Sequence, residues 1–373
     1  MPGSSAASLQ PVPAYLKDYE ELYARDPRKA ALQWFADAKF GMLIHYGLAS
    51  LDGIHPFEQW YCKIPVNEFE KKAGRFTADG FDADATAGLA QKTGMRYITM
   101  VTKHCHGFCL WDTKETGFSS LKAASRRDLV KEMAEACRKR GLGFFVFYEH
   151  GFEWHHPHAP RVKDWKCRLT EVPYPEPDPA YAHGDQYDMN KYVDFVSAQI
   201  TELLTQYGPV AGVWLDGYAV PMSGDRSKFR LPELYDQIHR LQPQALISYK
   251  LGVTGTEDFL APEISWFVNE VEQEGDVVDT SGVSSRISKA RKAGQPVEVC
   301  DTMAPRWFYM KNEKLRSGEY VLRNLKMARS LGINYLLNIG LMPDGSINPQ
   351  EAEILNAVGA TIRASNLLAD QPD

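Results

Sequence analysis

The sequence has 373 residues, of which 44% are hydrophobic and 24% are charged, proportions that are ordinary for a soluble globular protein. Its formal net charge of −6, from 42 basic and 48 acidic residues, argues against a protein that binds nucleic acid through a basic surface. No apolar run approaches the roughly 20 residues that a membrane-spanning helix needs. We therefore expect neither nucleic acid nor a membrane as a partner.

The sequence restricts the cellular compartment of the protein only weakly. Residues 1–13 lack a basic stretch followed by an apolar block, the pattern of an export signal. This predicts a cytoplasmic protein if the sequence is complete, and a periplasmic or secreted one if a signal has been removed. The six cysteines lack CxxC spacing, so neither a zinc ribbon nor a redox pair is indicated and free thiols are expected.

Eight short apolar segments recur along the chain, most of them separated by stretches long enough to hold a helix. This alternation predicts an α/β fold, and the count of eight fits a (β/α)8 TIM-like barrel of parallel strands. The segments are residues 41–47, 97–103, 143–149, 212–217, 245–250, 264–270, 296–301 and 333–340.

Apolar residues at helical spacing predict helices between these segments. The predicted helices are residues 82–93, 128–140, 189–206, 231–241, 285–292, 318–330 and 349–364. One alternation runs throughout, so we expect a single catalytic domain at residues 30–365, with an N-terminal lead-in at 1–29 and a tail at 366–373. Two long stretches without periodicity, residues 48–80 and 150–188, are expected as functional loops at the carboxyl ends of the strands.

The stretch from Gly212 to Gly217 places a carboxylate where a buried strand ends. Residues 212–215 form an apolar run after a turn signal at 207–209, which predicts a strand buried on both faces. Asp216 cannot easily continue such a strand, and Gly217 lets the chain turn away beside it. Asp216 is therefore the leading candidate nucleophile.

Polar residues end nearly every predicted strand, a pattern typical of an enzyme. They are His45, Lys103 with His104, Glu149 with His150, Asp216, Lys250, Glu270, Asp301 and Asn338. The carboxylates favour retaining glycoside hydrolysis, in which an ionised nucleophile faces a protonated carboxyl about 5–5.5 Å away. Three glutamates after the fifth segment, Glu257, Glu263 and Glu270, could supply that second carboxyl.

Several longer motifs occur in an order that is specific to one family. Residues 34–48 resemble its opening signature, residues 58–61 its Glu-Trp-Tyr element, residues 103–112 its Lys-His-His-Asp-Gly-Phe block, residues 154–157 its Trp-His-His-Pro loop, residues 214–216 its nucleophile motif and residues 337–345 its closing signature. The chain thus resembles glycoside hydrolase family 29, the retaining α-L-fucosidases, over most of residues 30–365.

The resemblance implies an exo-acting α-L-fucosidase that takes terminal fucose from a fucosylated oligosaccharide or glycoconjugate, with Asp216 as nucleophile and no metal or organic cofactor. Glu263 is the first choice for the acid/base, because residues 248–263 resemble the segment that carries it, and Glu270 is the alternative. The implied substrate-binding residues are His45, Glu58, Trp60, His104, His106, Trp214, Lys250 and Trp307. Assembly into a homo-oligomer is left open.

The sequence departs from the family's pattern at three points. Cys105 and His106 stand where the family usually has a second His and an Asp, and a thiol is a poor hydrogen-bond partner for a sugar hydroxyl. Lys250 replaces the more usual Arg, so it would bind as a point charge without a bidentate fork. The chain also ends near the closing signature, so the family's C-terminal β-sandwich is not expected.

Three other functions stay open at this stage. A retaining exo-glycosidase acting on a related sugar would use the same carboxylates. A zinc-dependent barrel hydrolase is suggested by the histidines at residues 104–106 and 155–158. A sugar-binding barrel without catalysis is disfavoured, because acids occupy all the proposed positions.

Overall fold

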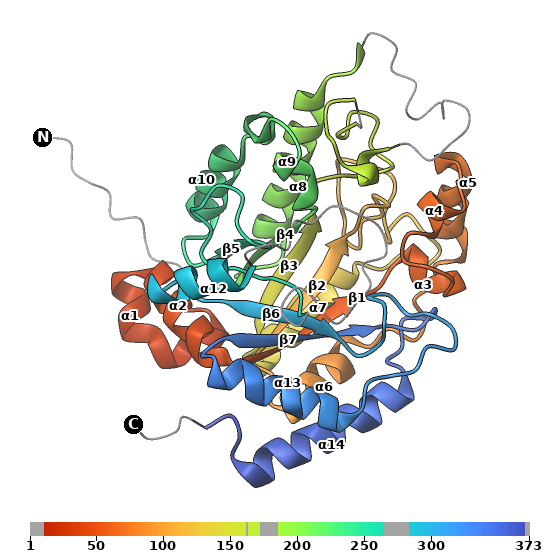
Figure 1. Ribbon diagram of the computed structural model, residues 1–373. Helices are drawn as coiled ribbons and strands as arrows, with labels where there is room; N and C mark the ends of the chain where they lie inside the picture. Colours follow the sequence, from red (N-terminus) through yellow and green to blue (C-terminus); the bar gives the residue numbers. More distant parts are fainter. Residues whose placement is uncertain (1–10, 162, 172–185, 265–282, 370–373) are drawn as a thin grey trace, which may run out of the picture.

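The computed structural model describes residues 11–161, 163–171, 186–264 and 283–369. Its centre is a curled sheet of seven parallel strands in the order β5-β4-β3-β2-β1-β7-β6 (Figure 1). The strands are β1 Phe40–His45, β2 Tyr97–Lys103, β3 Gly143–Glu149, β4 Gly212–Asp216, β5 Leu246–Tyr249, β6 Glu298–Thr302 and β7 Asn334–Gly340. Seven of the eight predicted strands are thereby confirmed.

The eighth predicted strand, residues 264–270, is not seen among the described residues. Ile264 lies in a turn and the remainder of that segment falls outside them. The chain just before it, residues 258–264, nevertheless lies between the two edge strands of the sheet. Ala261 N–H donates to Lys250 O beyond the end of β5 (2.7 Å), and Cys300 N–H in β6 donates to Pro262 O (3.0 Å). An irregular segment therefore supplies hydrogen bonds to both edges of the curled sheet.

Side chains alternate between the two faces of the strands, as the pleat requires. On one face, residues such as Phe145, Phe147 and Trp214 form a cluster inside the curl of the sheet, together with Trp34 and Phe35 of helix α2, Pro27–Ala38. The Trp34 ring lies 6.3 Å from that of Phe145, in a stacked arrangement. Helix α2 thus closes the amino-terminal end of the strands, and the opposite end is left for a site.

The outer helices pack against the other face of the sheet and agree with the predicted ones. They are α6 Ala83–Thr93, α7 Leu129–Arg140, α8 Met189–Gln206, α10 Leu231–Leu241, α12 Val283–Lys292, α13 Gly318–Ser330 and α14 Pro349–Ser365. Asp82, Asp128 and Asp188 each cap a helix by accepting a hydrogen bond from a backbone N–H in its first turn. These local caps explain why the helix starts were legible from sequence.

The amino-terminal segment is helical. It forms η1 Ala14–Tyr19 and α1 Glu20–Arg25, both of which contact α2. The predicted boundary between a lead-in and the catalytic domain, at residues 29 and 30, falls inside α2.

The first long stretch after a strand, residues 48–80, was predicted as a loop without regular structure, and that prediction is wrong. It contains α3 Leu48–Asp52, α4 Glu58–Tyr61, α5 Val66–Glu70 and η2 Lys71–Arg75. These helices are too short for the periodicity of their apolar residues to be recognised. In the second stretch the described part includes one short helix, η3 Arg168–Thr170. Two further short helices, α9 Ala219–Met222 and η5 Arg226–Phe229, follow β4.

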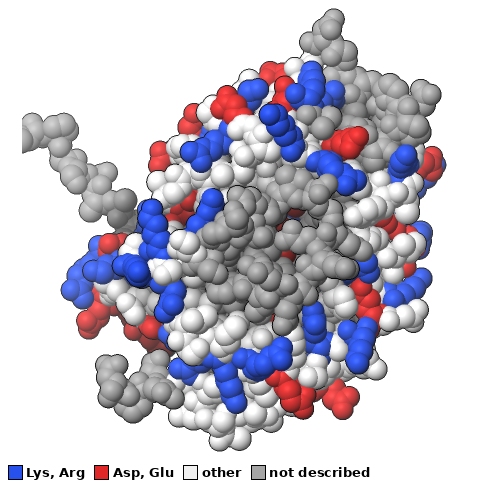
Figure 2. All heavy atoms as spheres, viewed as in Figure 1, with Lys and Arg blue, Asp and Glu red and all other residues white. Residues whose placement is uncertain are grey.

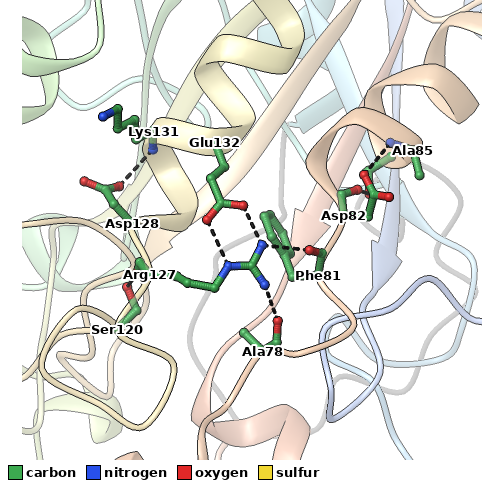
Figure 3. A network of polar contacts seen from close by, with 10 residues as sticks. Ala78, Phe81, Asp82, Ala85, Ser120, Arg127, Asp128, Lys131 and Glu132 are labelled. Carbon is green, nitrogen blue, oxygen red and sulfur yellow. Dashed lines mark hydrogen bonds and ion pairs between the residues drawn. The ribbon is translucent and has the colours of Figure 1, made fainter.

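Arg127 fastens the end of the first stretch to the start of α7 (Figure 3). Its guanidinium donates to Phe81 O (2.8 Å) and Ala78 O (2.5 Å), and it forms two bonds to the Glu132 carboxylate. The Ser120 hydroxyl donates to Arg127 O (2.7 Å). One planar cation thus joins residues 78–81 to the start of α7. The six cysteines are all free thiols, as predicted.

Candidate active site

A pocket that is partly open to solvent lies at the carboxyl ends of the strands. Its walls combine polar groups from strand ends with aromatic rings, which is the composition of a small-molecule site. The lining residues are Leu43, His45, Phe57, His104, Phe147, Glu149, Phe152, Leu169, Trp214, Asp216, Gly217, Tyr218, Ala219, Lys250, Glu263, Cys300 and Trp307.

Asp216 ends β4 and opens onto this pocket, with 21% of its side chain exposed. Its Oδ1 accepts a hydrogen bond from the backbone N–H of Gly217 at 2.8 Å. Gly217 has a φ of +83°, and a side chain there would collide with Glu149 and the backbone of Gly151. Glycine is therefore required for the turn that presents the carboxylate.

Lys250, directly after β5, joins two carboxylates across the pocket. Its Nζ lies 3.6 Å from Asp216 Oδ1 and 2.7 Å from Glu263 Oε1, and only 6% of its side chain is exposed. The ammonium also lies 4.8 Å from the centre of the Trp214 ring. Burial by itself lowers the pKa of Lys250, but Asp216 and then Glu263 outweigh it and raise the pKa well above its usual value.

Two histidines of the pocket wall are held neutral. His45 Nδ1 lies 2.6 Å from Asn338 Oδ1, and burial is the main cause that keeps the pKa of His45 well below its usual range. Burial, with a smaller effect from Lys250, lowers the pKa of His104 to about 3. Neutral imidazoles offer one donor and one acceptor each, so both rings are suited to polar contacts with a ligand.

Aromatic rings form the apolar part of the wall. Trp214 is fully buried, stacks on Phe147 at 5.1 Å between ring centres and donates its Nε1–H to Glu298 Oε1 at 3.0 Å. Trp307 lies beside His45, with 5.5 Å between ring centres. The hydrogen bond to Glu298 and the stacked Phe147 ring hold the Trp214 side chain in place, so its position in the pocket is defined before any ligand binds.

The comparisons with known proteins show which family the chain resembles. A model of the family described as alpha-L-fucosidase matches residues 7–366. The chain belongs to the α-L-fucosidase family. It is 26% identical to the tissue alpha-L-fucosidase of Bos taurus, over 96% of this chain and 73% of that one.

Two solved structures of other α-L-fucosidases are similar over nearly the whole chain. Isoenzyme 1 from Paenibacillus thiaminolyticus is 30% identical with a TM-score of 0.76, over 91% of this chain and 77% of that one. AlfC from Lactobacillus casei, in complex with the α-L-fucose product, is 28% identical with a TM-score of 0.74, over 90% of this chain and 99% of that one. This chain is accordingly a glycoside hydrolase, as its sequence predicted.

The family membership favours a glycosidase over a zinc-dependent hydrolase. Among the described residues, no helix is both long and apolar enough to cross a membrane. Figure 2 shows Lys and Arg interspersed with Asp and Glu over the described part of the visible face. The described part of that face therefore shows no continuous basic stripe of the kind that nucleic-acid-binding proteins carry.

Seven of the residues predicted for the α-L-fucosidase site line the pocket together: His45, His104, Trp214, Asp216, Lys250, Glu263 and Trp307. Three others do not line it. Glu58 is buried in an ion pair with Lys72, and Trp60 donates its Nε1–H to Glu171 O at 3.3 Å. His106 lies beside a smaller cavity that His104 separates from the main pocket, since His104 lines both.

The three candidate acids have different surroundings. Glu263 lines the pocket, whereas Glu270 lies outside the described residues. Glu257 is buried and accepts hydrogen bonds from the Tyr235 hydroxyl (2.9 Å) and from the backbone N–H groups of Val253 and Thr254. A carboxylate with so many donors organises its own loop, which leaves Glu263 and Glu270 as the candidates.

Glu149 also lines the pocket. Its sequence position predicted only that it ends a strand, and no role in the site was expected of it. It pairs with Asp216 across β3 and β4, is buried, and has one carboxyl oxygen with no hydrogen-bond partner among the described residues. Burial, and then the charge of Asp216, raises the pKa of Glu149 well above its usual value. Its position one residue before an expected loop was the available signal.

Proposed function

We propose that this chain is a retaining exo-α-L-fucosidase with a (β/α)8 catalytic domain, in which residues 258–264 stand in place of a regular strand between β5 and β6. Its substrates would be fucosylated oligosaccharides or glycoconjugates. A related AlfC structure holds Fucα(1,6)GlcNAc, which supports that class of substrate.

The separation of the two carboxylates carries the proposal. Lys250 Nζ lies 3.6 Å from Asp216 Oδ1 and 2.7 Å from Glu263 Oε1. These two oxygens are therefore at most about 6.3 Å apart, which is the sum of the two distances. That upper limit is compatible with the about 5–5.5 Å of retaining enzymes and falls short of the about 6.5–9.5 Å of inverting ones.

In the proposed first step, Asp216 attacks the anomeric carbon as the bond to the departing oxygen breaks, and the acid protonates that oxygen. In the second step the residue that acted as the acid now acts as the base and takes a proton from water. The water oxygen bonds to the anomeric carbon, and the bond between that carbon and Asp216 breaks. Fucose leaves with its configuration retained and both carboxyls are restored. No metal or organic cofactor is needed in this sequence of steps.

Lys250 lies between the two carboxylates and contacts Glu263 more closely than Asp216. Glu263 would have to leave its 2.7 Å contact with the Lys250 ammonium when the sugar arrives, in order to donate a proton to the departing oxygen. Glu270 is the alternative acid, and experiment has to choose between the two.

The remaining pocket residues would select the sugar. His45 and His104, both neutral, would bond to its hydroxyls, and Trp214 with Trp307 would face the apolar C5 methyl group of fucose. Glu58, Trp60 and His106 were also assigned to the sugar from sequence. They would have to act through a rearranged loop or through His104, because they do not line the pocket.

Azide rescue with an aryl α-L-fucoside tests the assignments. Asp216→Gly should lose nearly all turnover, and azide should then yield the β-fucosyl azide. Glu263→Ala should hydrolyse slowly, and azide should yield the α-anomer, because the azide displaces the covalent intermediate. Glu270→Ala tests the alternative acid in the same way. Glu257→Gln is the control variant, because Glu257 accepts hydrogen bonds within its own loop. Wild-type turnover in Asp216→Gly would contradict the mechanism, and α-azide formation by Glu270→Ala alone would assign the acid to Glu270.

A related sugar is the second candidate, because the same carboxylates would serve a different retaining exo-glycosidase. The aromatic wall favours a deoxy sugar with a methyl group, so kcat/KM should be highest for the α-L-fucoside in a panel of aryl glycosides. A higher kcat/KM for a sugar with a hydroxymethyl group would transfer the proposal to that sugar.

A further inference from the structure

Three consecutive residues next to the pocket bring metal-ligating atoms together. One nitrogen from each of His104 and His106 and the Cys105 sulfur all lie within 4.8 Å of one another. His104 Nδ1 is 3.0 Å from Cys105 Sγ. On a tetrahedral zinc ion with bonds of about 2.0 Å to nitrogen and 2.3 Å to sulfur, neighbouring donor atoms lie about 3.5 Å apart. The cluster can therefore reach that geometry by small side-chain rotations.

His106 is held as a metal-binding histidine usually is. Its ring stacks on Phe69 at 4.9 Å and meets the edge of Trp154 at 5.4 Å, and it forms a hydrogen bond with the backbone of Pro56. Its Nε2 is buried and has no hydrogen-bond partner among the described residues. A second ring nitrogen anchored to the backbone, with the first left as an acceptor, is the arrangement that orients an imidazole for a metal ion.

Carboxyl groups lie close to the Cys105 thiol. Glu149, Asp216 and Glu153 are the acidic groups that act electrostatically on it. Lys103 forms an ion pair with Glu153, yet Glu149 and Glu153 each have a buried oxygen with no hydrogen-bond partner among the described residues. A cation bound to the Cys105 sulfur would deprotonate the thiol that coordinates it.

We propose that His104, Cys105 and His106 form a zinc site that regulates the enzyme by reversible inhibition. Two imidazoles and one thiolate suit Zn²⁺, and the fourth position is left for water. Binding replaces the S–H bond with a sulfur–zinc bond and releases one proton to solvent.

The inhibitory role rests on the proposed glycosidase function. His104 lines the sugar pocket and also belongs to the cluster, so a bound ion would hold its ring away from a hydroxyl. The transition state of glycoside hydrolysis carries positive charge on the sugar, and a divalent cation beside it would oppose that charge. This ion therefore differs from a catalytic zinc, which would be needed for turnover.

Cobalt provides a test that needs no substrate. Chelator-treated protein is titrated with Co²⁺, and the thiolate-to-cobalt charge-transfer band in the near ultraviolet is recorded. One equivalent should produce the band in the wild type and in Cys109→Ser, which removes a buried thiol outside the cluster. The band should be lost in Cys105→Ser and weakened in His106→Phe, with circular dichroism confirming that each variant is folded.

Zinc inhibition is measured in parallel, with an aryl α-L-fucoside and each variant's own metal-free rate as reference. Zn²⁺ should inhibit the wild type, a chelator should reverse the effect, and Cys105→Ser should need at least about 10-fold more Zn²⁺, because outer-shell changes alone cost roughly 10- to 100-fold in affinity. A missing wild-type band, or a band that persists in Cys105→Ser, overturns the site. Zinc that binds without slowing turnover overturns the inhibitory role.

Discussion

Glu298 is a carboxyl buried beneath the catalytic pocket, and its replacement by glutamine tests the electrostatics of the interior. It begins β6 and is 1% exposed. Its two oxygens accept hydrogen bonds from the Trp214 indole (3.0 Å) and from the Tyr97 hydroxyl. Burial raises its pKa from 4.5 to about 7, although both hydrogen bonds act in the opposite direction.

The sign of the effect follows from the neutral form being favoured in the folded state. The stability that Glu298 contributes is fully present below pH 4.5, and it is lost as the pH rises through about 7, because a buried negative charge must then be formed. At 1.36 kcal/mol for each pH unit, the full difference is about 3 kcal/mol. Between pH 5 and pH 8 the expected loss is about 2.5 kcal/mol.

Glu298→Gln keeps the shape and an acceptor for Trp214 but cannot ionise. Urea unfolding of the wild type and the variant at both pH values isolates the effect, because all other titrating groups cancel in the comparison. The free energy of unfolding of the variant, relative to the wild type, should increase by about 2.5 kcal/mol from pH 5 to pH 8. The exposed Glu135 on α7 supplies the control variant Glu135→Gln, which should show no such change. Equal pH dependence in Glu298→Gln and the wild type would refute the reasoning.

Three further predictions concern the pocket and its base. Lys250→Met removes the cation that contacts both carboxylates. The value of kcat/KM should fall by about 100-fold, since a displacement of catalytic groups by about 1 Å can cost that much. An unchanged kcat/KM would contradict this role. Burial and the charge of Asp216 raise the pKa of Glu149, and Glu149→Gln imitates the neutral form that they favour. Activity of the variant should persist at low pH, and any decline that accompanies ionisation of Glu149 should disappear from the pH profile. A large loss of activity at low pH would show that the ionised form is needed. Trp34→Ala removes the indole through which α2 packs against the amino-terminal end of the strands. It should lower the free energy of unfolding, measured with denaturant, by about 3–5 kcal/mol. A loss below about 1 kcal/mol would mean that α2 does not close this end.

The predictable parts of the fold were those encoded by nearby residues. Helix α8 was predicted with its observed bounds, because its apolar residues recur at helical spacing and a turn signal follows. The strand before Asp216 was predicted from a continuous apolar run, residues 212–215, that follows a turn signal. By contrast, the short helices at residues 48–75 have too few turns to show a period. The chain at residues 258–264 is held by bonds to two strands, which no local pattern reveals.

The candidate site divides in a similar way. Asp216, His45 and Lys250 end strands, and parallel strands bring their carboxyl ends to one edge of a sheet, so their meeting could be predicted. The loop residues Glu58 and Trp60 come from excursions whose path depends on distant contacts, such as Lys72 with Glu58 and Glu171 with Trp60. Their distance from the pocket wall was therefore not predictable.

The sequence by itself determined the order of strands and helices, the family and the leading nucleophile, because spacing, caps and motifs are local and survive without coordinates. Only the tertiary structure decided which side chains share a pocket. It separated Glu263 from Glu257, brought Lys250 between two carboxylates and buried Glu149 beside Asp216. These outcomes depend on desolvation and on distances of a few ångströms between segments far apart in the chain. Neither quantity can be predicted from a local sequence pattern.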